Sequence, residues 1–414
     1  MPSSLYNIIG GNMKSVIKDL DTFGRGITKI NDKVCFVEKA LPSEEVEIEI
    51  INEKKNYIEA ETSNIIKESD YRILPICPYY DKCGGCHLMH LDRKGELLYK
   101  EEKVTDALSK FAGLKDVNIK DIIYANEHYY RNKLTLHIKD NKLGLYTKNT
   151  NDLIEIDECV ITNQTINEII PRLKDYLETN KSNLNEIVIK TTSSNYMMII
   201  FKGETNINSL KDSFNDIDSV YLNDKLVIGK EYIEENLNDL VFYIYPDSFF
   251  QVNYYTQKLM YNKVIDYYKE HKDLNILDLY CGTGTIGMLV SKYTKSVIGV
   301  EINSDAIKSA NLCKEVNNIS NIEFILGSVE DNIDKFDNID SIIVDPPRSG
   351  LDKHTVSSIM KINPSSIIYI SCDIVTLARD LNTLKENYNI KEVTPIDMFP
   401  NTYHVETLCI LERK

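Results

Sequence analysis

The chain has 414 residues, of which 43% are hydrophobic, and this length predicts two to three domains with ordinary buried cores. Its formal net charge of -15 argues, taken alone, against a nucleic-acid partner, because phosphate binding relies on lysine and arginine. It contains no apolar run of roughly 18 residues and starts without a signal-peptide pattern, so we expect a cytoplasmic protein with no membrane partner.

Residues 15–66 alternate apolar and polar positions in short runs separated by glycine, Asn-Asp and Pro-Ser signals. This pattern predicts a small β-barrel. Through G-R-G-I, F-V-E-K-A-L-P and the E-E-V that follows, the stretch resembles a TRAM domain, an OB-like RNA-binding barrel. The alternative is an unrelated barrel that only braces its neighbour. We assign residues 1–70 to this domain.

A cysteine-rich segment follows, C-P-Y-Y-D-K-C-G-G-C, with thiols at Cys77, Cys83 and Cys86. Close thiolates with turn residues between them can converge on one metal centre, and Cys159 is the best candidate for a fourth ligand. Four thiolates suit structural zinc or an iron-sulfur cluster, and the spacing does not separate the two. His87 and His90 are alternative ligands for zinc.

Residues 71–142 carry 13 basic and 10 acidic side chains and four of the seven histidines. Helical periodicity over 97–111 is followed by H-Y-Y-R-N-K, which combines stackable rings with Arg131 and Lys133. These residue types hold RNA bases and phosphates, so an RNA face is expected here. The alternative is an edge strand with exposed charge. Further strands close a mixed α+β central domain, residues 71–240.

From about residue 243, P-D-S-F-F-Q-V-N leads into a predicted helix over 254–271. A buried strand over 276–280 then runs into C-G-T-G-T-I-G, where the glycines permit unusual φ angles and close approach to a ligand. Glu301 ends the next strand, where an acid can accept hydrogen bonds from ribose hydroxyls. This motif fits a nicotinamide or flavin dinucleotide as well as S-adenosylmethionine.

Strands and helices alternate downstream, which predicts an α/β fold with a doubly wound, mainly parallel sheet over residues 241–414. Three later strand ends carry residues that a dehydrogenase does not need, in D-P-P-R, S-C-D and P-N-T-Y-H-V-E. The prolines after Asp345 stiffen a loop beside the bound nucleotide. A D-P-P turn in this place suggests a methyltransferase, although Arg348 stands where base N-methyltransferases carry an aromatic residue.

Cys372 follows a strand over 367–371 and precedes a helix, a placement expected to lower the pKa of its thiol. Attack of a thiolate on C6 of uracil converts C5 into a carbon that can take a methyl group. Glu406, in H-V-E at the start of the last strand, is then a credible base for removing the C5 proton. The alternative for Cys372 is a buried core cysteine.

The motifs S-C-D-I-V-T-L-A-R-D, D-M-F-P-N-T-Y-H-V-E, F-F-Q-V-N and D-L-Y-C-G-T-G-T-I-G resemble the RNA 5-methyluridine methyltransferase family. With the barrel and the cysteine set, the resemblance covers nearly the whole chain. It implies a class I S-adenosylmethionine-dependent methyltransferase fold, Cys372 as nucleophile and Glu406 as base. The implied contacts to S-adenosylmethionine are Gln251, Tyr280, Gly282, Gly284, Thr285, Glu301, Ser328 and Asp345.

The same resemblance implies a 4Fe-4S cluster on the four cysteines Cys77, Cys83, Cys86 and Cys159, with zinc as the alternative metal. RNA contacts are assigned to Arg131, Lys133 and Arg348. Ile374 departs from the family, which usually has proline there. The accessory barrel and cysteine set favour 23S ribosomal RNA over transfer RNA as substrate, and we expect a monomer. The rival functions are a nicotinamide or flavin oxidoreductase and a non-catalytic RNA-binding module.

Overall fold

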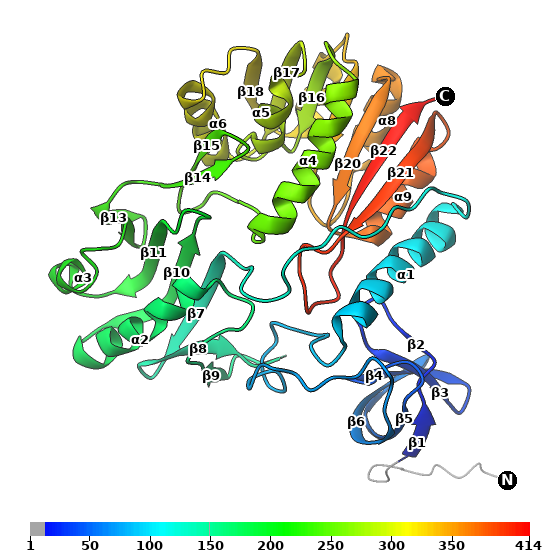
Figure 1. The fold of residues 1–414 in the computed structure, drawn as a ribbon, viewed down its shortest axis with the longest axis vertical. Coiled ribbons are helices and arrows are strands. Elements are labelled where there is room, and N and C mark those ends of the chain that lie inside the picture. Colours follow the sequence, from blue (N-terminus) through cyan, green and yellow to red (C-terminus); the bar gives the residue numbers. More distant parts are fainter. Residues whose placement is uncertain (1–12, 149) are drawn as a thin grey trace. The chain divides into compact units, whose positions relative to one another are not determined.

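The computed structural model describes residues 13–148 and 150–414 (Figure 1). The chain forms two compact units, one made of residues up to 103 together with 401–404, and the other of residues 104–400 with 405–414. The short segment 401–404, just before the last strand, therefore belongs to the N-terminal unit. In the described ranges, no helix is both long and apolar enough to cross a membrane.

The N-terminal unit is built on a six-stranded sheet with the order β1-β5-β6-β4-β3-β2. Its strands are β1 (Met13–Val16), β2 (Asp19–Leu20), β3 (Gly26–Ile30), β4 (Lys33–Glu38), β5 (Glu45–Glu53) and β6 (Tyr57–Lys67). Alternate side chains point inward, and Val37, Val46, Ile48 and Ala60 are fully buried in one apolar cluster. The predicted β domain is confirmed.

Helix α1 (Arg93–Ala112) joins this sheet to a seven-stranded sheet with the order β13-β12-β11-β10-β7-β8-β9. Its strands are β7 (Lys133–Lys139), β8 (Lys142–Tyr146), β9 (Leu153–Glu155), β10 (Asn183–Thr191), β11 (Met197–Glu204), β12 (Ser219–Leu222) and β13 (Lys225–Gly229), with helices α2 (Gln164–Thr179) and α3 (Ile207–Ser213). Lys133, the last residue of the H-Y-Y-R-N-K segment, begins β7, and residues 128–132 precede this strand. Because β7 lies between β10 and β8, the edge-strand alternative for the segment is wrong. A hairpin, β14 (Ile233–Leu237) and β15 (Leu240–Ile244), follows.

The C-terminal sheet has the order β18-β17-β16-β19-β20-β22-β21 (Figure 1). Its strands are β16 (Asn275–Leu279), β17 (Ser296–Glu301), β18 (Ile322–Leu326), β19 (Ser341–Val344), β20 (Ser366–Ser371), β21 (Tyr388–Ile396) and β22 (Glu406–Arg413). The first five are parallel, and β22 runs antiparallel to both of its neighbours. The accompanying helices are α4 (Tyr254–Glu270), α5 (Thr285–Ser291), α6 (Ser304–Val316), α7 (Val329–Asn332), α8 (Lys353–Ile362) and α9 (Ile374–Leu384).

Both faces of this sheet are buried. Along β16, Leu277 and Leu279 join an apolar cluster with α8, α9 and the end of α1, whereas Ile276 joins a second cluster with α4 and α5. Successive side chains of a strand point to opposite faces, so the two clusters cover the two sides. The doubly wound sheet predicted from the sequence is confirmed, and it brings the ends of five parallel strands to one edge.

Candidate active site

A tight turn follows β16 at the carboxyl edge of the C-terminal sheet. Tyr280, Gly282 and Gly284 have φ angles of 61°, 54° and 74°. A Cβ at Gly284 would lie 2.3 Å from Cζ of Phe324, so only glycine fits there. A Cβ at Gly282 would meet no heavy atom within 4 Å, which leaves this backbone open to a ligand. Thr285, the first residue of α5, is buried.

Two further predicted residues follow the adjacent parallel strands. Glu301 ends β17, and its Oε2 and Oε1 accept from the backbone N–H groups of Gly282 and Asn303 at 3.0 and 2.8 Å. Ser328 comes after β18, and its Oγ accepts from the Asp331 N–H at 3.1 Å at the start of α7. Because β16, β17 and β18 are parallel, these residues share one edge with the glycine turn.

Asp278, inside β16, was not singled out from the sequence. Its carboxyl is 2% exposed, and Oδ2 accepts from the Gly287 N–H at 3.0 Å. Burial raises the pKa of Asp278 to about 8, the Gly287 N–H opposes the rise, and the charges of Asp345 and Glu301 add to it. The signal for this residue was an acid within an otherwise apolar strand.

Gln251 lies in the segment that leads into α4. It is 6% exposed, and its carbonyl accepts from Nδ2 of Asn132 at 3.0 Å, which ties the segment to the central sheet. Two turns along α4, Tyr261 lies close enough to Asp345 and Glu406 for their charges to add to the effect of burial, which raises the pKa of its hydroxyl. Helix α4 therefore borders Asp345, which follows β19, and Glu406, which begins β22.

Lys190, in β10, anchors the same segment and was also missed. Its ammonium is buried and donates to three backbone carbonyls at 2.6–3.1 Å, those of Tyr245, Pro246 and Ser248. Burial and the charge of Lys133 lower the pKa of Lys190 to about 7, and Asp247 opposes this. Its three hydrogen bonds fix the backbone that precedes Gln251.

Cys372 and Glu406 come from adjacent strands. Strands β20 and β22 pair antiparallel with Ser371 opposite Thr407. Cys372 follows β20 directly and Glu406 begins β22, so the two lie side by side at the sheet edge. Burial, followed by the charges of Glu406 and then Asp345, raises the pKa of Cys372 to about 11.

The prediction of a lowered pKa for this thiol is wrong, because burial and the charges of Glu406 and Asp345 outweigh the opposing charge of Arg348. Oδ1 of Asp373 accepts from the N–H groups of Val375 and Thr376 at 3.0 and 2.9 Å, so a carboxylate already occupies this helix end. Ile374 is the first residue of the helix, a position that also suits proline, and its side chain is buried in the core. Isoleucine in place of the family's usual proline at position 374 therefore leaves the start of α9 unchanged.

Asp345 follows β19 and completes a charged group with Glu406 and Arg348. Burial raises the pKa of both carboxyls, and the charge of Asp345 raises that of Glu406 further. Arg348 lowers the pKa of Glu406 and of Cys372, but does not outweigh burial. Two interacting buried carboxyls do not both ionise readily near neutral pH, so this edge can retain one proton and accept another.

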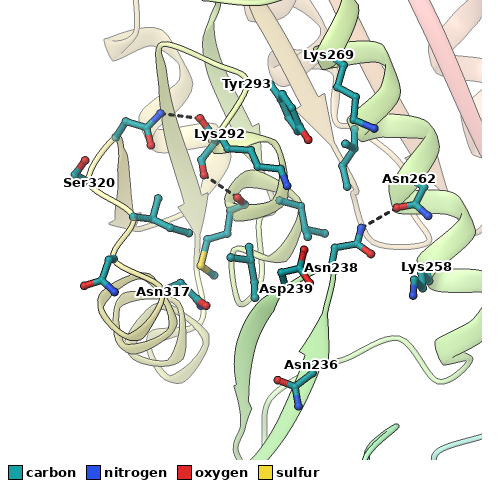
Figure 2. A pocket seen from close by; sticks show the side chains of 18 of the residues that line it. Asn236, Asn238, Asp239, Lys258, Asn262, Lys269, Lys292, Tyr293, Asn317 and Ser320 are labelled. Atoms are coloured by element: carbon teal, nitrogen blue, oxygen red, sulfur yellow. Dashed lines mark hydrogen bonds between the residues drawn. The ribbon is translucent and has the colours of Figure 1, made fainter.

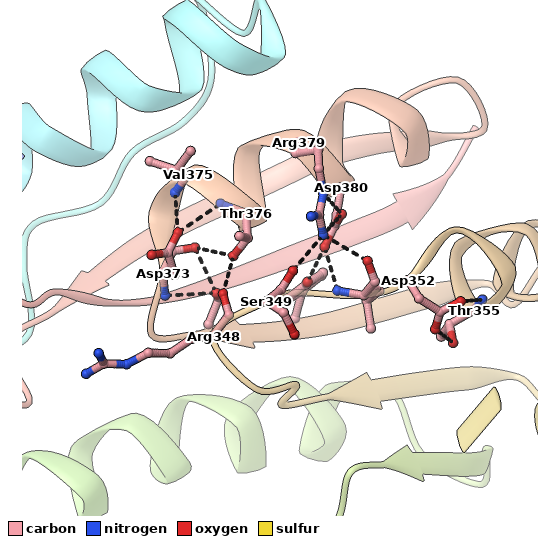
Figure 3. Close-up of polar contacts among 12 residues, drawn as sticks. Arg348, Ser349, Asp352, Thr355, Asp373, Val375, Thr376, Arg379 and Asp380 are labelled. Atoms are coloured by element: carbon pink, nitrogen blue, oxygen red, sulfur yellow. Dashed lines mark hydrogen bonds and ion pairs between the residues drawn. The ribbon is translucent and has the colours of Figure 1, made fainter. Parts of the chain in front are cut away.

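The loop after Asp345 is held by α9 (Figure 3). Oδ2 of Asp380, which is 3% exposed, accepts from the Leu351 N–H at 2.9 Å and from the Tyr369 hydroxyl at 2.7 Å. Arg379 donates from Nη2 to the carbonyls of Ser349 and Leu351 at 3.0 and 2.8 Å. Arg379 and Asp380 end the motif S-C-D-I-V-T-L-A-R-D, but no role for either residue was predicted from the sequence.

Arg348 has a fixed backbone and an exposed side chain. Its carbonyl accepts from Thr376 Oγ1 at 3.2 Å, and Figure 3 shows its guanidinium extending away from the network that holds the loop. The charge is therefore carried at the sheet edge and stays available to an anionic group. Of the three predicted RNA contacts, this is the one that lies beside Cys372.

Of the other two predicted RNA contacts, Arg131 lies two residues before β7 and Lys133 begins that strand. Nε of Arg131 donates to the Lys133 carbonyl at 3.0 Å. Desolvation, followed by the charges of Arg131 and Lys202, lowers the pKa of Lys133. The charges of Glu186 and Asp247 oppose this shift, and Lys202 is paired with Glu186 at 2.7 Å, so Arg131 and Lys133 remain as two neighbouring positive charges that phosphate groups can stabilise.

The structure gives no support to the predicted metal centre. Cys77, Cys83 and Cys86 belong to the N-terminal unit, and Cys159 to the larger unit. Across residues 13–148 and 150–414, no three His, Cys, Asp or Glu side chains are arranged to hold a metal ion.

A cavity of about 930 Å³ lies away from these residues (Figure 2). Its lining includes Lys258 on α4 and Tyr293 and Asn321, which stand in the loops that precede β17 and β18. Those loops are at the amino ends of parallel strands, whereas the glycine turn and Cys372 follow carboxyl ends. Ligands of doubly wound sheets bind at the carboxyl ends, so this cavity is not the candidate active site.

Comparisons with known proteins show the family. Residues 93–414 match the tRNA (Uracil-5-)-methyltransferase family, and residues 16–62 match the TRAM domain. A Clostridium tetani protein described as an uncharacterized RNA methyltransferase is 37% identical over 451 residues, covering 99% of this chain and 96% of the relative. A Bacillus cereus protein with the same description is 34% identical over 439 residues, covering 96% of each.

A solved structure is also similar along most of the chain. It is that of a Pyrococcus abyssi tRNA (uracil-54, C5)-methyltransferase in complex with S-adenosyl-L-homocysteine, with a TM-score of 0.80 and 29% identity, covering 96% of this chain and 100% of that one. The oxidoreductase and the non-catalytic RNA-binding module are therefore excluded as functions. The chain belongs to the RNA uracil-5-methyltransferase family and is an S-adenosylmethionine-dependent enzyme that methylates uracil C5 in RNA.

Proposed function

We propose that Cys372 is the nucleophile and Glu406 the base of this methyl transfer. The observation that carries the proposal is the pairing of β20 with β22, which makes the two residues neighbours at the edge where the glycine turn also ends. The charge of Glu406 acts on the Cys372 thiol, in keeping with a short separation. A nucleophile and a proton acceptor side by side are what addition and elimination at one double bond require.

The reaction begins when the Cys372 thiolate forms a bond to C6 of the uracil, and the electrons of the C5–C6 double bond move towards the C4 carbonyl. C5 then takes the methyl group that the sulfonium donor supplies, and S-adenosylhomocysteine is the leaving group. Glu406 removes the proton from C5, the double bond returns, and the C6–sulfur bond breaks to regenerate the thiolate. Arg348 favours this chemistry because its charge lowers the pKa of Cys372.

The donor is proposed to lie across the ends of β16 to β19. Gly282 and Gly284 allow the protein backbone to approach the donor closely, and the carboxylate of Glu301 can accept hydrogen bonds from its ribose hydroxyls. Asp345 provides a carboxyl for the cationic end of the donor. The remaining proposed contacts, each described above, are Gln251, Tyr280, Thr285 and Ser328.

The catalytic proposal is tested with a donor carrying a labelled methyl group and unmodified RNA. Cys372→Ala is expected to reduce formation of 5-methyluridine by about 10⁴-fold or more, as loss of a covalent nucleophile does. Cys35→Ala removes a buried thiol in the N-terminal sheet and serves as the matched control. Full activity of Cys372→Ala, or a product other than 5-methyluridine, contradicts the proposal.

We propose ribosomal RNA as the substrate class, because the barrel and the cysteine set resemble those of the ribosomal branch of the family. Transfer RNA is the second candidate, which the description of the Pyrococcus abyssi structure favours. Transcripts of both classes lack modification and can be offered in competition at equal concentration. Preferential methylation of the ribosomal transcript supports the first candidate, and preferential methylation of the transfer RNA transcript replaces it with the second.

We propose that residues 1–70, 71–240 and 241–414 act as barrel, central and catalytic domains. Within the central domain, we propose that Arg131 and Lys133 contact RNA phosphates. Replacement of Lys133 by Met is expected to weaken RNA binding on all sequences and to lower the slope of log affinity against log salt by about 1. An unchanged salt slope contradicts a phosphate contact. Lys225→Met, on the edge strand β13 of the same sheet, is the control.

We propose, from the cysteine spacing and the family resemblance, that Cys77, Cys83, Cys86 and Cys159 bind a 4Fe-4S cluster, with zinc as the alternative. The N–H of Gly85 donates to Cys83 Sγ at 3.4 Å, the kind of contact that stabilises a thiolate. Metal and acid-labile sulfide are measured after anaerobic purification of the wild type and Cys83→Ala. Iron with sulfide in the wild type alone supports the cluster, zinc alone supports the alternative, and neither metal contradicts both.

A further inference from the structure

The loop formed by residues 401–404 is fixed within the N-terminal unit, although it directly precedes the strand that carries Glu406. The N–H of Asn401 donates to Oε1 of Glu96 at 2.7 Å, and its carbonyl accepts from the His87 N–H at 2.9 Å. The Glu96 carboxylate is 2% exposed and is paired with the buried Lys100 ammonium. A buried, paired carboxylate thus positions the start of this loop.

Four rings gather around this loop, those of Phe23, His87, Tyr403 and His404, here called the ring platform. Tyr403 is at its centre, with ring centroids 5.5 Å from Phe23, 4.4 Å from His87 and 4.3 Å from His404. Below it, Tyr403 packs against an apolar cluster that includes Leu88. The platform is rigidly supported, yet Phe23 is 55% exposed and the other three rings are partly exposed.

Two cations border the platform. The guanidinium of Arg25, which is paired with Asp21 at 2.7 Å, lies 5.6 Å from the centre of the Phe23 ring, and the ammonium of Lys103 lies 5.3 Å from that of Tyr403. Lys103 also donates to the Tyr403 carbonyl at 2.7 Å, which holds its charge beside the rings. Exposed rings beside fixed cations are the combination with which proteins hold unpaired bases and the backbone that joins them.

The platform is tied to the reaction by the chain itself. His404 is two residues before Glu406, and an extended chain spans at most about 3.6 Å per residue, so their Cα atoms are within about 7 Å of each other. A nucleotide next to the target uridine is therefore within reach of the His404 end of the platform. We propose that the ring platform stacks an unpaired RNA base that neighbours the target uridine, an inference that rests on the proposed function.

The test measures RNA binding without the donor, so that it does not depend on methyl transfer. The probe is a short single-stranded RNA of adenosine and uridine carrying one 2-aminopurine, whose fluorescence falls when the base stacks. Phe23→Ala is expected to weaken binding of this RNA by about 5- to 150-fold and to reduce the quenching. Phe23→Tyr, which keeps a ring, is expected to retain most of both.

The matched control is Phe111→Ala, because Phe111 is 52% exposed on α1 and lies outside the ring platform. It is expected to bind the probe as the wild type does, and both alanine variants are expected to keep the wild-type melting temperature within a few degrees. Equal affinity of Phe23→Ala and the wild type overturns the inference, as does an equal loss in Phe111→Ala. Binding without methylation by the wild type would instead count against the proposed function alone.

Discussion

The two halves of the C-terminal sheet edge are built on different principles. On β16 and β17 the backbone makes the site, with left-handed φ angles in the glycine turn and N–H groups directed at Glu301. On β19, β20 and β22 titratable side chains make it, and burial raises the pKa of Asp345, Cys372 and Glu406. Donor binding at the glycine turn after β16 should therefore be sensitive to an added side-chain atom. Catalysis at the ends of β19, β20 and β22 should be sensitive to a change of charge that leaves the side-chain shape unchanged.

The strongest way to separate the regions is Glu406→Gln, which keeps the shape and removes the base. We expect turnover to fall by about 10² to 10⁴-fold, as loss of a general base does. Because the C5 proton then stays in place, a covalent protein-RNA adduct should accumulate, visible as a slower band on a denaturing gel. The control is Glu412→Gln at the other end of the same strand. Normal turnover without an adduct rules out Glu406 as the base.

A pair of glycine substitutions tests the first region. Gly284→Ala places a Cβ 2.3 Å from Phe324, and we expect a loss of about 1–3 kcal/mol in stability together with weaker donor binding. Gly282→Ala meets nothing within 4 Å and carries only the backbone cost of its positive φ. Thermal unfolding measures the stability of each variant, and calorimetry with S-adenosylhomocysteine measures its donor binding. Equal losses in the two variants show that contact with Phe324 does not decide the effect.

The backbone-built region was the more predictable from sequence. Hydrophobic runs and glycine spacing are local signals. The predicted strand over 367–371 lies within β20, and the predicted helix starts at 254, as α4 does. The proximity of Cys372 and Glu406 was expected only because Cys372 follows one strand and Glu406 begins another. The antiparallel register that makes them neighbours depends on how β22 enters the sheet, which no local pattern encodes.

Electrostatic properties were the least predictable. The sequence placed Cys372 before a helix, but whether that end is available depends on Asp373, which caps it. Likewise, an acid within an apolar strand gives no indication of its partner, so the contact of Asp278 with Gly287 was missed. Burial and charge coupling arise from residues far apart in the chain, and only the folded arrangement determines the sign of each shift.

Arg348→Met changes the charge of the second region without altering the core. Arg348 lowers the pKa of Cys372 and Glu406, so removing it raises both, and the form that has lost its protons appears only at higher pH. We expect the ascending limb of kcat/KM against pH to move up by about 1 unit, roughly tenfold in rate at neutral pH. Arg348→Lys keeps the charge and should restore the wild-type limb. A lower rate with an unshifted limb assigns Arg348 to RNA binding alone.

The smallest expected effect concerns Asp278, the acid that lies beneath the backbone-built turn. Because its folded pKa of about 8 is above the ordinary value of 3.8, its contribution to stability is complete only below about pH 4 and is lost progressively as pH rises from there through about 8. Asp278→Asn keeps an oxygen for the Gly287 N–H without a charge to bury. Wild type and variant should therefore differ least at pH 4, and the variant should be more stable at pH 9 by about 1 kcal/mol or more. Denaturant unfolding at both pH values measures the difference in free energy of unfolding. A variant that is less stable than the wild type at pH 9 shows that the turn needs the charged carboxylate. In that case the donor-binding turn depends on charge as well as on its backbone.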